Sequence, residues 1–223
     1  MNDRLANYAV RLSSDQKNAI FRAEQAWALI EDLPLPGSIL DVGCGSGEFL
    51  RLASARDVAV VVGIEGPTGA VEAARANGLQ IAQLDIESAP FPFEDHSFDL
   101  VVCMETLEHL YDPAAVVGRI WRAVKPGGHF IASVPNASNL PYRIRILLGA
   151  SISPPQTVGG HIKFFRPRDL INMCNGQGFR LRLIRGVAYP TAYQSYRVLM
   201  PLLLRASPWL VATWIFALFS KVG

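Results

Sequence analysis

The sequence predicts an α/β domain in which seven strands form one mostly parallel sheet, with an antiparallel last strand and helices on both faces. Short runs rich in valine and isoleucine alternate with stretches of helical periodicity, which is typical of parallel strands joined by crossover helices. A glycine-rich turn follows the first of these runs, at residues 43–47. A chain of 223 residues that is 50% hydrophobic can bury the core of one such domain, so we expect a single domain over residues 1–223.

Residues 1–36 are predicted to form a helical segment ahead of the sheet. Apolar residues recur among charged and small ones across 14–32, with Ser13, Ser14 and Asp15 as candidate caps, and the prolines at 34 and 36 end the helix. The first ten residues lack the apolar core of a secretory signal, so a cytoplasmic location is expected.

Strands and helices then alternate as far as residue 134. The sequence KPGG at 125–128 predicts a turn into the fifth strand. The expected strands are 38–42, 58–64, 80–84, 98–104 and 129–134, and the expected helices are 48–56, 68–77 and 113–124.

The alternation breaks at residues 136–160, where an apolar stretch with arginines (140–148) lies among prolines and glycines. Such a long insertion predicts a lid over the acceptor or a membrane contact. A helix at 168–177 and a strand at 179–187 resume the pattern.

The apolar carboxyl-terminal stretch has an uncharged run, 206–220, that is shorter than the ~20 residues of a spanning helix. A connecting helix and a buried last strand at 210–219 are expected, with an interfacial helix as the alternative.

Charge is divided unevenly along the chain. Residues 1–112 carry 7 Lys/Arg and 18 Asp/Glu, whereas residues 113–223 carry 14 Lys/Arg and one acid, Asp169. Either the two halves interleave and their charges pair, or the second half forms a basic face for an anionic acceptor, an anionic membrane surface or RNA. Cys44, Cys103 and Cys174 have no metal-binding spacing, so we expect them to be reduced and mostly buried.

The glycine-rich turn is a candidate cofactor site. Its glycines permit positive φ angles and let a ligand lie against bare backbone where a helix begins. Glu48 stands where a dinucleotide-binding GxGxxG loop needs its last glycine, which counts against a nicotinamide cofactor. This segment resembles the class I S-adenosylmethionine-dependent methyltransferase superfamily, whose DxGxGxG motif is matched by Asp41, Gly43, Gly45 and Gly47.

The resemblance continues over residues 38–134 and implies a Rossmann-like sheet that binds S-adenosyl-L-methionine. It implies that Glu65, at the end of the second strand, binds the two ribose hydroxyls of the cofactor. It also implies that Asp85 and Ile86, at the end of the third strand, bind the adenine. Met104 is expected in the core or in the wall of the cofactor pocket.

Three chemically reactive side chains follow the fourth strand. Glu105, Glu108 and His109 stand in i, i+3, i+4 relation, so one helical turn would direct them to one point. Carboxylate and imidazole donors of this kind suit Mg²⁺ or Mn²⁺.

These residues resemble the ExxEH motif of two families, the small-RNA 2′-O-methyltransferases and the ubiquinone-biosynthesis O-methyltransferases. The resemblance implies a metal held by Glu105, Glu108, His109 and a later histidine, here His161, which would lower the pKa of an acceptor hydroxyl. The alternatives are His109 or His161 as a metal-free catalytic base, and a structural role. A partial resemblance to methionine-biosynthesis-type methyltransferases covers residues 134–136 and 143–149.

The sequence therefore predicts methyl transfer to a hydroxyl of a lipid-, quinone- or glycan-like small molecule, beside an anionic membrane surface. One alternative is an RNA 2′-O-methyltransferase, which the basic half permits but the scarcity of clustered aromatic residues disfavours. The other is a non-catalytic partner protein that binds S-adenosylmethionine.

Overall fold

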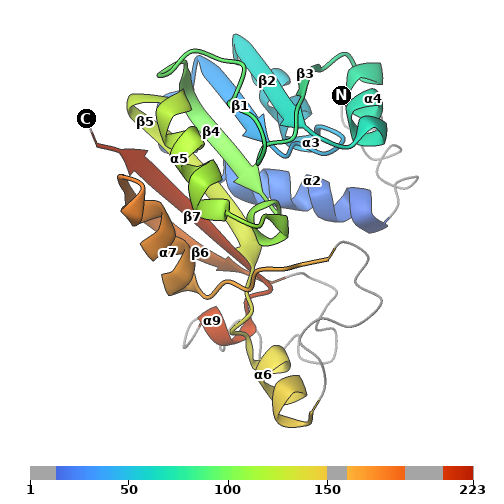
Figure 1. The fold of residues 1–223 in the computed structure, drawn as a ribbon, viewed down its shortest axis with the longest axis vertical. Helices are drawn as coiled ribbons and strands as arrows, with labels where there is room; N and C mark the ends of the chain where they lie inside the picture. Colours follow the sequence, from blue (N-terminus) through green and yellow to red (C-terminus); the bar gives the residue numbers. More distant parts are fainter. Residues whose placement is uncertain (1–13, 150–159, 189–207, 223) are drawn as a thin grey trace.

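A single seven-stranded sheet organises the molecule in the computed structural model, which describes residues 14–149, 160–188 and 208–222 (Figure 1). The strand order is β3-β2-β1-β4-β5-β7-β6, and β7 runs antiparallel to both of its neighbours while the other pairs are parallel. This topology confirms the predicted fold class. The strands are β1 (Ser38–Val42), β2 (Val60–Glu65), β3 (Gln80–Gln83), β4 (Phe98–Met104), β5 (Val124–Pro135), β6 (Phe179–Val187) and β7 (Trp214–Lys221).

Helices cover both faces of the sheet. Residues of α2 and α3 share one core cluster with β7, whereas α5 and α7 pack with β4, β5 and β6 in the cluster on the other face (Figure 1). The helices are α2 (Ser14–Trp27), α3 (Glu48–Ser54), α4 (Thr68–Ala76), α5 (Pro113–Ala123), α6 (Leu140–Leu147), α7 (Pro167–Gly176) and α9 (Pro208–Val211), with a short 3₁₀ helix, η1 (Leu107–His109).

Local sequence explains why α5 forms where it does. The Asp112 side chain accepts a hydrogen bond from the Ala115 amide at 3.0 Å, and Pro113 occupies the first turn. Both features are typical of a helix start. Its apolar stripe, which includes Val116 and Ile120, is buried against the sheet and fixes which face of α5 points inward.

The turn predicted at 125–128 lies inside β5. Val124 already pairs with Phe98, and the register then shifts before His129 pairs with Leu100. Gly127 adopts a φ of 75°, so the glycine pair forms an irregularity within a longer strand, as in a β-bulge.

Other boundaries differ by a few residues. Helix α2 ends at Trp27, short of the predicted residue 32, and β7 begins at Trp214 as a buried last strand. Helix α9 precedes β7, as the predicted connecting helix should, while residues 189–207, the far part of the 136–160 insertion and Ser13 lie outside the described residues. Within the described ranges, no helix has the length and hydropathy of a membrane span.

Candidate functional site

The glycine-rich turn between β1 and α3 lies where the carboxyl ends of the parallel strands meet, the usual ligand edge of such sheets. Gly43, Gly45 and Gly47 all have positive φ, at 74°, 56° and 85°. A Cβ on Gly43 would lie 2.3 Å from Thr106 Oγ1, and one on Gly47 would lie 2.1 Å from Leu79 Cδ1. At Gly45 a Cβ would meet nothing within 4 Å, so its backbone faces open space where a ligand can approach.

A cavity of about 490 Å³ opens on one side of this turn, lined by residues from the ends of β2, β3 and β4. Glu65 is held in its wall by two backbone amides, since Gly45 N donates to Oε2 at 2.7 Å and Gly66 N donates to Oε1 at 2.9 Å. Asp85 and Ile86 line the same cavity. The structure thus brings the three residues predicted for the adenosine half of the cofactor to one place.

The segment after β3 is fixed by hydrogen bonds. Asp85 accepts from Ser88 Oγ at 2.5 Å and from the Glu87 amide, and the Ser88 bond is the largest influence that lowers the pKa of Asp85. Arg119 of α5 donates to the Ile86 carbonyl and, at 2.9 Å, to the Glu87 carbonyl. The sequence held no signal for Arg119, because the contact joins two distant segments.

A second cavity, of about 330 Å³, lies on the other side of the turn and is lined by Arg22 of α2, Asp41, Met104 and Glu105. Asp41 is 2% exposed, and burial, followed by the charges of Glu65 and Glu48, raises its pKa to about 8. Both cavities share Gly43, Gly45 and Glu105. One elongated ligand can therefore contact both cavities, and Arg22, which sequence analysis did not single out, lines the second.

Glu108, His109 and His161 form the one group of metal-type donors found among the described residues. One donor atom from each lies within 4.8 Å of the others. Both histidine Nε2 atoms are 4.0 Å from Glu108 Oε1, and the two rings have centroids 4.8 Å apart. His161 is held beside Glu108 because the next two amides, Ile162 N and Lys163 N, donate to the Glu108 carbonyl at 2.9 and 3.0 Å.

The electrostatics of this group fit a divalent cation. Glu108 is 1% exposed, and neither carboxylate oxygen has a hydrogen-bond partner in the described part of the chain. Burial, with the Glu105 charge, raises the pKa of Glu108 to about 9. Burial, then His109, lowers the pKa of His161, which keeps its imidazole neutral and able to coordinate a metal. A buried carboxylate without a partner beside two imidazoles is the donor set that a cation would stabilise.

Glu105 does not join this group. Its φ is 51°, and only Leu107–His109 form the 3₁₀ turn, so the prediction of one helical turn from Glu105 to His109 is wrong. The cause is a left-handed residue directly after β4, which ends the regular spacing. Burial raises the pKa of Glu105 to about 7, against the opposing charge of Arg22.

The chain is similar to known proteins over most of its length. The family model described as "Methyltransferase domain" matches residues 16–184. A ubiquinone biosynthesis O-methyltransferase of Neisseria meningitidis is 34% identical over 71% of this chain and 70% of its own. The Vibrio cholerae protein of the same name is 33% identical, over 72% and 68%. A SAM-dependent methyltransferase structure from Thermotoga maritima aligns with a TM-score of 0.68 at 18% identity, covering 98% of this chain and 97% of that one, which supports the fold.

Proposed function

Because the chain belongs to the family of S-adenosylmethionine-dependent methyltransferases, we propose that it methylates a hydroxyl of a quinone-like small molecule. Two named relatives from different organisms are ubiquinone biosynthesis O-methyltransferases, which favours this acceptor class over RNA. The observation that carries the proposal is the partnerless, buried Glu108 between His109 and His161, because it lies beside the cavity that the cofactor would fill.

The two cavities divide the cofactor between them. Glu65 would accept hydrogen bonds from the ribose diol, since a carboxylate has about four lone-pair sites and only two backbone amides use them here. Asp85 and Ile86 would bind the adenine. In the second cavity, Arg22 would pair with the methionine carboxylate, and Asp41 would stabilise the positive charge of this half.

Methyl transfer needs the acceptor oxygen in line with the sulfonium methyl and a place for the hydroxyl proton. The oxygen forms a bond to the methyl carbon as the carbon–sulfur bond breaks, and the electron pair of that bond stays on sulfur. His109 lines the cavity that contains Glu65, and the neutral His161 lies against it, so without a cation either imidazole can take the proton.

Glu108, His109 and His161 would hold Mg²⁺ or Mn²⁺. When bound, the ion supplies a Lewis acid that lowers the pKa of the acceptor hydroxyl. With three protein donors, such an ion retains coordination positions for oxygens of the acceptor or for water.

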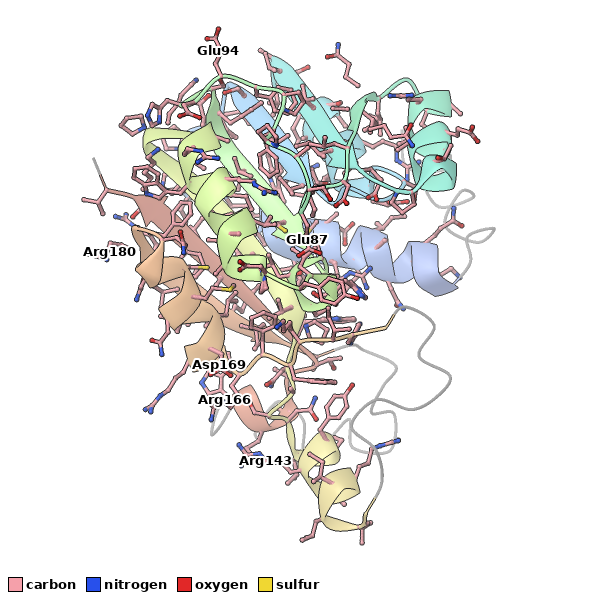
Figure 2. All side chains as sticks on the ribbon, viewed as in Figure 1. Glu87, Glu94, Arg143, Arg166, Asp169 and Arg180 are labelled. Carbon is pink, nitrogen blue, oxygen red and sulfur yellow. The ribbon has the colours of Figure 1, made fainter. Side chains whose placement is uncertain are left out.

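Helix α6 suggests how a lipid-like acceptor reaches the site. None of its residues is buried in the described structure, Leu147 is 85% exposed, and Ile144 and Ile146 are also exposed. Arg143 and Arg145 lie on the same short helix. Arg143 lies at the opposite end of the molecule from Glu94 (Figure 2). We propose that α6 contacts an anionic membrane surface, which would bury its aliphatic side chains and attract its basic ones.

Methyl-labelled cofactor tests the proposed reaction. The protein is supplied with an alkyl-substituted ortho-diphenol, or with a short RNA, together with Mg²⁺. We expect label on a phenolic oxygen of the diphenol and S-adenosylhomocysteine in equal amount. If only the RNA is labelled, on its ribose 2′-oxygens, the proposed acceptor class is wrong. If no S-adenosylhomocysteine forms with either acceptor, the assignment of a hydroxyl acceptor has no support.

A further inference from the structure

We propose that Glu105 binds the α-ammonium group of the cofactor's methionine half and is not a ligand of the cation site. The inference rests on the proposed function, because it places S-adenosylmethionine across the two cavities. It concerns a residue that the ExxEH resemblance assigns to the metal.

The side chain of Glu105 is held by donors from two other strands. Ser133 Oγ of β5 donates to Glu105 Oε1 at 3.0 Å, and the indole of Trp214, the first residue of β7, also hydrogen-bonds to the carboxylate. Trp214 in turn lies against the Arg22 guanidinium, 5.6 Å from its carbon to the ring centroid. Glu105 is therefore fixed by β5 and β7, and Trp214 also contacts Arg22, which lines the second cavity.

The backbone of Glu105 favours the same arrangement. Its amide donates to the Ser133 carbonyl at 3.0 Å, which extends the β4–β5 pairing by one residue, and its φ of 51° then turns the chain into η1. A left-handed non-glycine residue is strained, and such outliers persist where surrounding contacts hold them. This conformation separates Glu105 from the spacing that would place it beside Glu108.

The charges around the second cavity match an amino-acid group. Its described lining contains the carboxylates of Asp41, Glu48 and Glu105 and the guanidinium of Arg22. A methionine half carries one carboxylate, for which Arg22 is a partner, and one ammonium, which requires acceptors. Glu105 has lone pairs beyond the two that Ser133 and Trp214 use, so it can accept from the ammonium without losing its own supports.

Two nucleosides separate this role from a structural one. S-adenosylhomocysteine carries the α-ammonium group, whereas 5′-methylthioadenosine has the same adenosine and sulfur without the amino-acid part. Glu105→Gln preserves the shape of the side chain and an acceptor for Ser133. We expect it to weaken S-adenosylhomocysteine binding about tenfold or more, because a charge-assisted bond is lost, and to leave 5′-methylthioadenosine binding unchanged. The matched variant Glu65→Gln should weaken both.

Calorimetric titration of Mn²⁺, without turnover, supplies the second comparison. Glu105→Gln should retain the Mn²⁺ site, whereas Glu108→Gln should lose it. Weaker Mn²⁺ binding in Glu105→Gln with unchanged S-adenosylhomocysteine binding would overturn the inference, as would no change in either. If Glu105→Gln does not melt cooperatively, Ser133→Ala takes its place. We expect it to lose less affinity for S-adenosylhomocysteine than Glu105→Gln would. Unchanged affinity for both S-adenosylhomocysteine and 5′-methylthioadenosine would contradict the inference.

The two proposals can fail separately. If the unmodified protein binds no S-adenosylhomocysteine, the proposed cofactor arrangement fails. If it binds S-adenosylhomocysteine but no Mn²⁺, only the cation site of the proposed function fails, and the nucleoside pair still decides the role of Glu105.

Discussion

Glu108 Oε1 and His161 Nε2 lie 4.0 Å apart, although one residue follows β4 and the other precedes α7. The Glu108 carbonyl accepts from two successive amides beyond His161, so the same residue that presents the buried carboxylate also positions the histidine. The acid and the imidazole are thus organised together, which leads to the first prediction.

Removing the cation should stop turnover without displacing the cofactor. We expect excess EDTA to abolish methyl transfer, Mg²⁺ or Mn²⁺ to restore it, and His161→Ala to lose at least ~100-fold in kcat with little change in S-adenosylhomocysteine affinity. His129→Ala is the matched control, since His129 is a half-buried histidine at the other end of β4 and β5. Full activity in EDTA together with an inactive His161→Ala would favour a metal-free histidine base.

Gly47→Ala should damage both the fold and the cofactor site. The new Cβ would require a left-handed conformation and would lie 2.1 Å from Leu79 Cδ1, so we expect the free energy of unfolding to fall by at least ~1–2 kcal/mol. Gly69→Ala in α4 is the control, because its Cβ would meet nothing within 4 Å, and alanine should stabilise that helix by about 0.5–1 kcal/mol. Chemical denaturation measures both values, and equal effects would contradict the role of the turn.

Asp41 should make cofactor binding depend on pH. Its pKa in the ligand-free protein is raised from 3.8 to about 8, so its contribution to stability is present at low pH and is lost as the pH rises across that interval. The α-ammonium group of the methionine half favours the ionised form of Asp41, so S-adenosylhomocysteine affinity should rise between about pH 6 and about pH 8. Asp41→Asn should bind more weakly, with a flatter pH profile by calorimetry. An identical profile in the two proteins would refute the assignment.

Arg119 should position the adenine-binding segment without touching the reaction. Arg119→Ala removes its bonds to the Ile86 and Glu87 carbonyls. We expect S-adenosylhomocysteine and 5′-methylthioadenosine to bind about tenfold more weakly each, with KM for the cofactor raised and kcat nearly unchanged. Arg122→Ala, an exposed position on the same helix, should change neither affinity. A loss confined to kcat would place Arg119 in the chemistry instead.

Helix α6 should bind anionic vesicles. The double variant Arg143→Glu/Arg145→Glu should float with phosphatidylserine-containing liposomes at least tenfold less than the unmodified protein, since each basic residue near such a surface contributes about 1 kcal/mol. Binding should weaken with salt. The control is Arg180→Glu/Arg182→Glu on β6, both exposed, with Arg180 labelled away from α6 in Figure 2. Equal flotation of all three proteins at every salt concentration would show that α6 is not the membrane-binding surface.

Local pattern determined much of this protein. The strand periodicity, the caps of α5 and the glycines at 43, 45 and 47 depend on residues close in sequence, and β1, α3 and β4 formed within a few residues of where they were predicted. Glu65 and Asp85 were singled out by the family resemblance, and the structure places both at one edge because the ends of parallel strands necessarily meet there.

Only the tertiary structure decided which side chains meet there. Arg22, Ser133 and Trp214 reach the site from a helix and two strands whose positions depend on sheet order and packing, which no local pattern encodes. The helical turn predicted from Glu105 to Glu108 failed for a related reason, since a strand bond to Ser133 holds the Glu105 backbone in the left-handed region. Local propensity is weak beside such long-range pairing, so the sequence placed the main elements to within a few residues, whereas the surroundings of Glu105 and Arg22 depended on the fold.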